Sequence, residues 1–379
     1  MKIIRVIFFI PILFLILMNG CTDDPPNAVG VSILPSRDGF NILSFDTTAN
    51  YSSSYLKRLS GASTLLMLGK YQDNEAASIL TFNLDSTLFP GSKIDSATLF
   101  FHIGYKFKDS VGTIGFQIRN MRSSWTAGTY TWDSLSTSSY SDTILESHVM
   151  HIQPGDTTLS IRLDTAVVRS WIWSGMGKCS IILLPTSSST MILGLSSSGS
   201  TETLMPKLSI AYHDSVDSSR VDSIFTTTKV YVANNTFPVA AQHFFVQGAV
   251  ADQGLLKFDV SRIPKNVSIT SATLQLSLDT TLSVRGYSTD SSLTAYIALD
   301  DSAKPTAGGL YGTGSFINSH TVTFPIASVV QQWVTKQTNH GVIIEVTSDY
   351  INFDRYSFYD FTAAPSLRPT LTVKYSVVR

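Results

Sequence analysis

Apolar and polar residues alternate along most of this chain, and one alternating pattern occurs twice. Residues 80–84 read Leu-Thr-Phe-Asn-Leu, and residues 256–260 read Leu-Lys-Phe-Asp-Val. A proline-containing connection follows each copy and leads into a second alternating stretch, at 94–103 and at 269–278. A period of two places successive side chains on opposite faces of a strand. Each copy therefore predicts two half-buried strands that cover one side of a core.

The repeat continues toward the end of each half of the chain. Val-Val-Arg-Ser-Trp at 167–171 matches Val-Val-Gln-Gln-Trp at 329–333, and each half ends with a proline-led strand pattern. The apolar residues Ile326, Val329 and Trp333 lie on one helical face, so we expect one short helix in each half. The remaining short strands and turns predict an all-β protein of two tandem β-sandwich domains of jelly-roll type.

Domain boundaries are predicted from the offset between the two copies. We expect a first β-sandwich domain over 46–213, a linker over 214–226 and a second β-sandwich domain over 227–379. The linker assignment rests on the polar stretch after residue 213, which has no clear periodicity.

Composition supports a folded protein and excludes one class of partner. The chain has 379 residues, of which 43% are hydrophobic and 15% charged, so a sizeable core can form. The net charge is −1 and lysines and arginines form no cluster, which argues against nucleic-acid binding.

The N-terminus has the pattern of a bacterial lipoprotein signal. Lys2 and Arg5 precede an apolar stretch over 6–18, which is short for a membrane span, and the sequence then runs through Gly20 to Cys21. This resembles a lipobox and predicts a signal peptide over 1–20, lipidation of Cys21 and a tether over 21–45. The alternative is an uncleaved membrane anchor. Both place the bulk of the protein outside the cytoplasm, held to a membrane at its N-terminus.

The order of these signals resembles the DNRLRE-type domain of bacterial and archaeal surface proteins, which is related to carbohydrate-binding modules. Leu-Leu-Lys-Phe-Asp at 255–259, Ser-Ala-Thr-Leu at 271–274 and the turn from Trp125 to Asp133 carry the resemblance. It implies carbohydrate binding by a non-catalytic β-sandwich. Acidic residues after Cys21 also resemble the surface-export signal of Bacteroidota lipoproteins, which implies a location on the outer face of the outer membrane.

Motifs of catalysis are missing from the sequence. There is no His-Glu-x-x-His, no Gly-x-Ser-x-Gly and no phosphate-binding loop, so we expect no enzymatic activity and no cofactor. His148 and His151 lie near Glu146 but are expected to be solvated, and Cys179 lies in an apolar strand pattern that predicts an inert thiol. Structural calcium, by analogy with other jelly-roll modules, has no Asp-x-Asp-x-Asn loop to support it.

Aromatic residues are the remaining binding candidates. Trp125, Tyr130 and Trp132 lie together beside Asp133, where exposed rings would stack on a sugar. The alternative is that they form a buried plug at one end of the sandwich. A second candidate group consists of Arg355, Tyr356 and Tyr359, interpreted as the exposed part of an aromatic stretch.

Two functions from different classes remain open on the sequence. The first is a lipid-anchored surface protein that binds glycan or a surface polymer. The second is a structural or adhesive surface protein whose repeats act as spacers or as modules that bind a surface protein. A fold alone does not decide between them.

Overall fold

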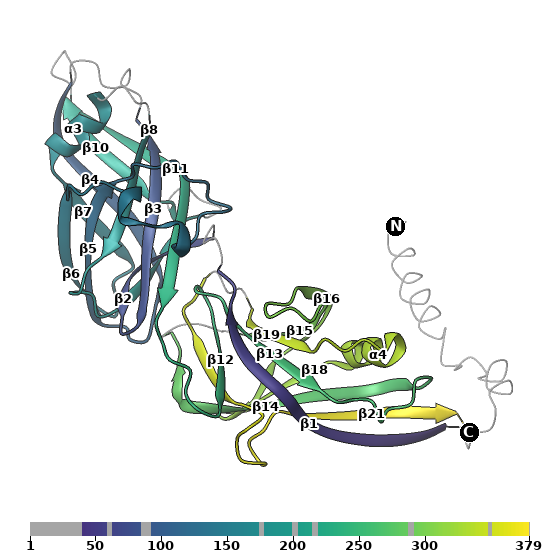
Figure 1. Ribbon diagram of the computed structural model, residues 1–379. Helices are drawn as coiled ribbons and strands as arrows, with labels where there is room; N and C mark the ends of the chain where they lie inside the picture. Colours follow the sequence, from purple (N-terminus) through teal and green to yellow (C-terminus); the bar gives the residue numbers. More distant parts are fainter. Residues whose placement is uncertain are drawn as a thin grey trace, which may run out of the picture.

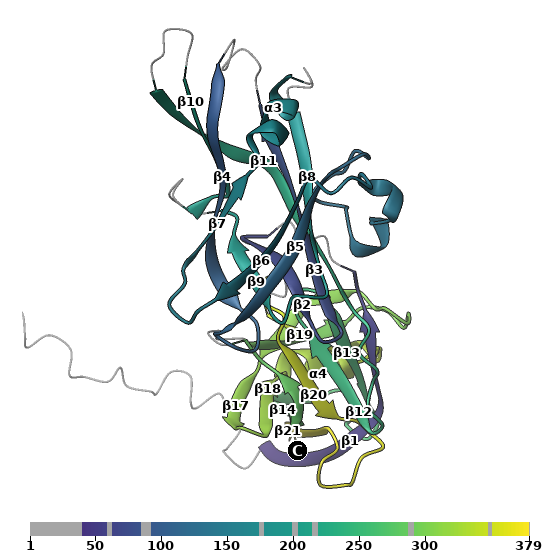
Figure 2. The ribbon, with the colours of Figure 1, turned by 90° about the vertical axis from the view of Figure 1, so that its left-hand side faces the viewer.

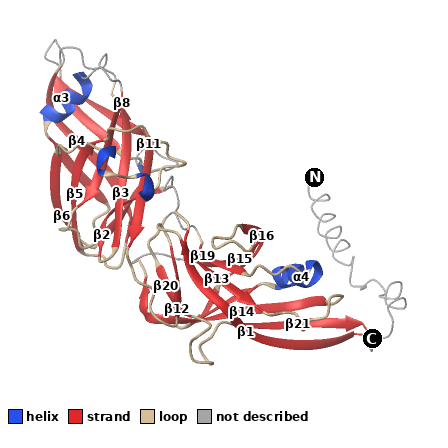
Figure 3. Ribbon diagram, viewed as in Figure 1, coloured by secondary structure: helices blue, strands red, loops and turns tan. Residues whose placement is uncertain are grey.

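The computed structural model describes residues 40–58, 63–84, 92–173, 178–198, 204–213, 219–286, 292–347 and 351–378. The predicted signal peptide, Cys21 and most of the predicted tether lie outside these residues. Strands dominate the described parts of the chain, and only two α-helices occur among them (Figure 3). The prediction of two β-sandwich domains, each with one short helix, is confirmed.

Each repeat supplies the same succession of elements. The first repeat contains β1 (Phe40–Leu56), β2 (Leu65–Tyr71), β3 (Asn74–Asn83), β4 (Lys93–Lys106), β5 (Gly112–Asn120), β6 (Glu146–Ile152), β7 (Thr158–Leu163), α3 (Thr165–Trp173), β8 (Lys178–Pro185), β9 (Ile192–Ser196) and β10 (Lys207–His213). Two short 3₁₀ turns, η3 (Trp132–Ser134) and η4 (Thr137–Ser139), lie between β5 and β6.

The second repeat follows the same plan with one additional short strand. It contains β11 (Ser219–Asn235), β12 (His243–Gln247), β13 (Asp252–Phe258), β14 (Ser268–Val284), β15 (Leu293–Ala298), β16 (Ala307–Thr313), β17 (Ser315–Asn318), β18 (Thr321–Pro325), α4 (Ala327–Lys336), β19 (Val342–Val346), β20 (Arg355–Tyr359) and β21 (Thr370–Val378). The extra strand is β17, which pairs with β18.

The strand order shows that the two repeats exchange their first strands. β1 pairs with β21 and β13 of the second repeat, whereas β11 pairs with β10 and β3 of the first. Ala49 of β1 lies opposite Phe258, and Thr226 of β11 lies opposite Phe82, the repeat equivalent of Phe258. The two strands therefore occupy equivalent places, each in the domain built by the other repeat (Figure 1).

This exchange corrects the predicted boundaries. Residues 40–56, assigned to the tether and the first domain, belong to the sheet of the second domain, and residues 219–235, assigned to the linker and the second domain, belong to the first. The physical reason is the short connection from β10 to β11, because consecutive strands usually pair as neighbours. Hereafter the first domain means β2–β10 with β11, and the second means β12–β21 with β1.

Each domain has two packed layers joined by strands that cross from one layer to the other. In the second domain β1 pairs with β21 along its first part and with β13 along its second part, with an irregular register between Ala49 and Tyr51. β11 does the same in the first domain, with its irregularity between Thr226 and Thr228. Figure 2 shows β10 and β11 in the upper domain, and β1 and β21 in the lower one.

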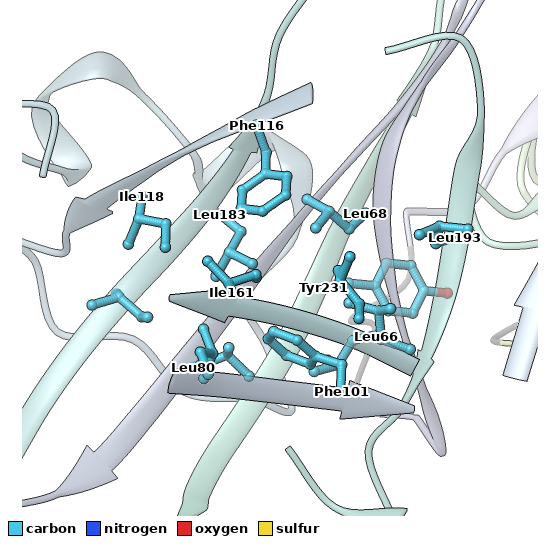
Figure 4. Close-up of a cluster of buried hydrophobic side chains, with 14 of the residues drawn as sticks. Leu66, Leu68, Leu80, Phe101, Phe116, Ile118, Ile161, Leu183, Leu193 and Tyr231 are labelled. Carbon is cyan, nitrogen blue, oxygen red and sulfur yellow. The ribbon is translucent and has the colours of Figure 1, made fainter. Parts of the chain in front are cut away.

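The core of the first domain contains a residue from the exchanged strand. Tyr231 of β11 is buried among residues of the first repeat, including Leu66, Phe101 and Leu183 (Figure 4). In the second domain Ala49 of β1 is buried in the corresponding core with Phe258. Apolar burial is the main favourable term in folding, so each domain depends on a strand from the other repeat.

The predicted helices form where the pattern placed them. Val168 and Trp171 of α3, and Val330 and Trp333 of α4, are buried against the sheets. The carboxylate of Asp164 accepts a hydrogen bond from the backbone N–H of Ala166 at 2.8 Å, a contact typical of a residue that caps the N-terminus of a helix. The N-cap position of α4 is occupied by Ile326, and no side chain makes a capping hydrogen bond there.

Candidate functional site

The predicted aromatic turn lies in the long connection between β5 and β6. Residues 121–145 fold back over the outer face of the sheet formed by β3, β8 and β11. Apolar residues of that face form a small separate core with the connection. Its buried members are Ala77, Ile79, Tyr130, Ile182, Val230 and Val232. The turn is thus packed on the outer face of this sheet.

The three aromatic residues of the turn differ in exposure. Tyr130 is buried, while Trp125 and Trp132 pack against the same small core and keep part of their surface in solvent. The Trp125 and Tyr130 ring centroids are 6.5 Å apart, with an interplanar angle of 65°. An edge-to-face pair of this kind fixes the position of Trp125. Both tryptophans therefore pack against the protein with part of their surface and expose the rest.

Asp133 connects the turn to the junction between the domains. Arg58, directly after β1, donates to the Asp133 carboxylate at 3.2 Å and to the side-chain oxygen of Asn234 at 2.8 Å. Asp133 is exposed, so the ion pair itself contributes little to stability. Its effect is geometric, because it ties the tryptophan-bearing turn to the ends of both exchanged strands.

The prediction that Arg355, Tyr356 and Tyr359 form an exposed aromatic group is wrong. Tyr356 is fully buried in the core of the second domain, and Arg355 is 4% exposed. The Arg355 guanidinium lies 3.4 Å from the centroid of the Phe237 ring, at the junction between the domains. Tyr359 is half-buried, with its ring 4.6 Å from that of His243. The alternation fails to predict exposure here because β20 is buried on both faces along most of its length: Tyr356 and Phe358 lie in the core, and the Phe237 ring lies over Arg355 on the other face.

Three tyrosines that the sequence interpretation did not single out lie on the same outer face of the second domain, Tyr51 at one edge and Tyr296 with Tyr311 at the other. Tyr51 of β1 is 43% exposed, Tyr311 of β16 is 56% exposed and Tyr296 of β15 is half-buried. The Tyr296 and Tyr311 rings are 5.4 Å apart. The alternation over 293–298 could have identified Tyr296 as outward-facing, since Leu293, Ala295 and Ile297 point inward.

Titratable side chains form no recognisable reaction centre in the described residues. His148 lies 3.7 Å from Glu146, and burial lowers the pKa of His148. Burial raises the pKa of the Cys179 thiol to about 12, so this thiol is unreactive at neutral pH. No group of three His, Cys, Asp or Glu residues suited to a metal ion occurs in the part of the chain that the structure describes.

Two hollows in the surface of the second domain lie away from the aromatic turn. An open groove of about 570 Å³ runs between β1, β21 and residues 259–262, with Asp46, Asp259 and Arg262 in its lining. A second hollow of about 340 Å³ lies beside the end of α4, with an apolar floor that includes Trp333. Neither brings together the groups of a catalytic site.

No protein-family model matches the chain, and no curated protein matches it in sequence. Among the described helices, none has the length and apolar character required to cross a bilayer.

Proposed function

We propose that this chain is a non-catalytic lipoprotein of the cell surface that binds glycan through its first β-sandwich domain. The observation that carries the proposal is the pair of part-exposed tryptophans, Trp125 and Trp132, in a turn fixed to the outer face of a sheet. Aromatic faces held in place lose little entropy when a sugar ring stacks on them. The resemblance of the sequence to carbohydrate-binding modules supports the same ligand class.

Hydrogen-bonding groups beside the tryptophans suit hydroxyl-rich ligands. Asp133 is exposed and carries acceptor oxygens, and Thr131 and Ser134 hydroxyls lie in the same 3₁₀ turn. Sugar hydroxyls both donate and accept hydrogen bonds, so a carboxylate and hydroxyls around an aromatic patch offer matched partners. This arrangement binds a ligand but contains no acid–base pair at a spacing that would cleave it.

Attachment to a membrane through Cys21 completes the proposal. β1 begins at Phe40, whose backbone pairs with Val378 at the far end of β21. A tether that leads into Phe40 would therefore hold the second domain nearer the membrane and the first domain farther from it (Figure 1). We expect fatty-acid labelling of the wild-type protein in bacterial cells and its loss in Cys21→Ser. Labelling that persists in the variant would contradict the anchor.

The glycan proposal is tested with the soluble fragment from Thr22 onward in affinity gel electrophoresis and on a glycan array. Binding should be lost in the Trp125→Ala/Trp132→Ala double variant. Trp173→Ala is the matched control, because Trp173 is 64% exposed on α3 and lies outside the turn. Near-ultraviolet circular dichroism and thermal unfolding show whether the double variant keeps its fold. Binding to a polysaccharide that the folded double variant retains would refute the role of the turn.

The second candidate function is that of a spacer or protein-interaction module, and the junction between the domains favours it. The two domains share exchanged strands and a buried contact region in which Phe107 of one lies 5.7 Å from Phe353 of the other, measured between ring centroids. A rigid pair of domains holds a distal surface at a fixed distance. Capture of an envelope protein by the wild type, with no retention on any polysaccharide gel, would favour this function.

A further inference from the structure

β1 is joined to the first repeat by the chain but to the second domain by its contacts. Its backbone pairs with β21 over residues 40–48 and with β13 over residues 49–56. The Ser54 hydroxyl donates to the carbonyl oxygen of Phe245 at 2.9 Å, while Leu56, the last residue of β1, packs against the core of the first domain. β1 is therefore bound mainly by the second domain.

β1 is less deeply buried than β11, its equivalent in the second repeat. Of the described side chains of β1, only Ala49 and Tyr55 are buried, whereas Ile42 is 67% exposed and Leu43 is 44% exposed. β11 instead buries four successive residues, 230–233. It also lies between β10 and β12 in the chain, so its departure would disturb paired strands on both sides. Separation of β1 from its sheet therefore exposes less apolar surface and costs less than separation of β11.

The two domains show that a first strand need not come from the repeat whose sheet it joins. Ala49 of β1 lies opposite Phe258, and Thr226 of β11 lies opposite Phe82, so both domains have an equivalent acceptor position for a first strand. Each position is filled by the strand of the other repeat. The acceptor position therefore requires a strand with matching side chains and backbone groups, whichever part of the chain supplies it.

A second copy of this chain carries the same strand, so it matches the acceptor position of the second domain as well as the chain's own β1 does. Exchange of an identical element between copies is a low-cost route to dimers, because the contacts are the same before and after exchange. The balance then depends on the effective concentration of the chain's own strand, which is on the order of 1 mM for a short connection. Chains that fold at comparable local concentrations should therefore exchange β1.

We propose that the acceptor position beside β21 and β13 is an interaction site for a second copy of this chain, which inserts its residues 40–56 there. Reciprocal insertion closes a two-fold symmetric dimer and leaves neither copy with an unpaired edge at β21 or β13. The inference does not rest on the proposed function, because it involves neither the tryptophan-bearing turn nor the membrane anchor.

Cysteines on opposite strands distinguish the monomer from the exchanged dimer. Ser44 of β1 and Lys374 of β21 lie opposite each other in the register, and both are exposed. In the chain from Thr22 onward the only native thiol is that of Cys179, which is buried. A short bismaleimide, added after refolding, should join the two new cysteines within one chain in the Ser44→Cys/Lys374→Cys double variant. It should join them between chains when the two single variants are unfolded in urea and refolded together.

The yield of the intermolecular cross-link should depend on concentration. We expect the cross-linked fraction at dimer mass to rise at least fivefold between refolding concentrations of about 10 µM and about 500 µM, because the upper value approaches the effective concentration of the chain's own strand. Ser44→Cys refolded with Trp173→Cys is the collision control, since Trp173 is 64% exposed on α3, outside the acceptor position. This control should give at least tenfold less dimer.

The outcomes separate strand exchange from other association. Concentration-dependent cross-linking above the collision control supports the inference. Cross-linking in the double variant alone, at every concentration, overturns it, as does a yield between the single variants that only equals the control. A dimer that light scattering detects without cross-linking of the two cysteines places the contact elsewhere and also overturns it. Absence of the cross-link in the double variant would mean that β1 does not occupy the acceptor position at all.

Discussion

Tyr105 of the first domain donates its hydroxyl hydrogen to the carboxylate of Asp354 in the second domain, at 3.0 Å. The same carboxylate oxygen accepts the backbone N–H of Gly286 at 2.7 Å, and the Tyr105 oxygen accepts the N–H of Phe353 at 3.0 Å. Both side chains are buried, and burial together with the charge of Asp354 raises the pKa of Tyr105, which keeps the donor proton in place. The junction between the domains is thus a fixed polar contact inside an apolar surround.

Tyr105→Phe removes this contact and should destabilise the protein. A hydrogen bond to a charged group contributes about 1.5–3 kcal/mol, and its loss leaves a buried carboxylate with one partner fewer. We therefore expect a fall of that size in the free energy of unfolding, measured by urea denaturation. Tyr140→Phe is the control, because its half-exposed ring lies over Arg119. Equal stability of the two variants would show that the contact does not hold the domains together.

Asp252 gives the junction a specific pH dependence. Its side chain is 6% exposed at the start of β13, and Asn235 of β11 donates to it at 2.6 Å. Burial raises the pKa of Asp252 to about 6, although the Asn235 hydrogen bond and the charges of Arg58 and Arg355 oppose the shift. In the unfolded chain an aspartate has a pKa of about 3.9, so the folded state binds the proton more tightly.

The sign of this effect follows from linkage. Between pH 4 and pH 6 the folded protein carries this proton and the unfolded chain does not, so stability falls as pH rises through that window and is constant above it. A difference of about 2 pKa units corresponds to about 3 kcal/mol. Asp252→Asn should remove this part of the pH profile and raise stability at pH 7.5, measured by denaturation from pH 4 to pH 8. A variant that is less stable at pH 7.5, with an unchanged profile, would contradict this assignment.

The repeat allows a matched comparison of two buried tryptophans. The Trp171 indole N–H donates to the Asn120 side-chain oxygen at 3.1 Å. In the second domain Ile297 occupies the position equivalent to Asn120, since Asn120 pairs with Ile181 and Ile297 pairs with its counterpart Val342. The Trp333 indole N–H is buried and has no hydrogen-bond partner among the described residues.

Replacement of each tryptophan by phenylalanine should therefore cost different amounts. Both substitutions remove apolar volume, but Trp171→Phe also breaks a hydrogen bond and leaves Asn120 without that donor. We expect Trp171→Phe to be more destabilising than Trp333→Phe by about 1–2 kcal/mol, from guanidinium chloride unfolding. The reverse order would mean that packing, rather than the hydrogen bond, dominates at these positions.

Much of each domain was predictable because the relevant signals are local. Alternation identified Leu80, Phe82, Leu256 and Phe258 as inward-facing, and all four are buried. Helical spacing around Trp171 and Trp333 identified α3 and α4. Such patterns depend on how one segment presents its own side chains to a core.

The strand exchange and the failure at Tyr356 have a common cause. A period of two gives the faces of a strand but does not say which sheet the strand joins, so β1 and β11 were assigned to the domains nearest in sequence. Likewise, β20 was interpreted as partly exposed because its own pattern does not reveal that Phe237, from the connection between β11 and β12, covers Arg355. In both cases, contacts with residues that are distant in the sequence decide where the strand lies and how far it is buried.

Fragments of the chain test the strand exchange most directly. A fragment over 64–235 contains β2–β10 with β11 and should fold, whereas a fragment over 46–213 lacks β11 and leaves β3 and β10 unpaired along one edge. Fragment 236–379 lacks β1 and should remain unfolded or aggregate, because an unpaired edge beside an open core invites association. Addition of a peptide over 40–56 should restore its cooperative unfolding. Circular dichroism and gel filtration measure these states, and a fragment over 46–213 that folds as well as 64–235 would refute the exchange.

Ala49→Asp in the added peptide places a charge where β1 enters the second core, so that peptide should fail to restore folding.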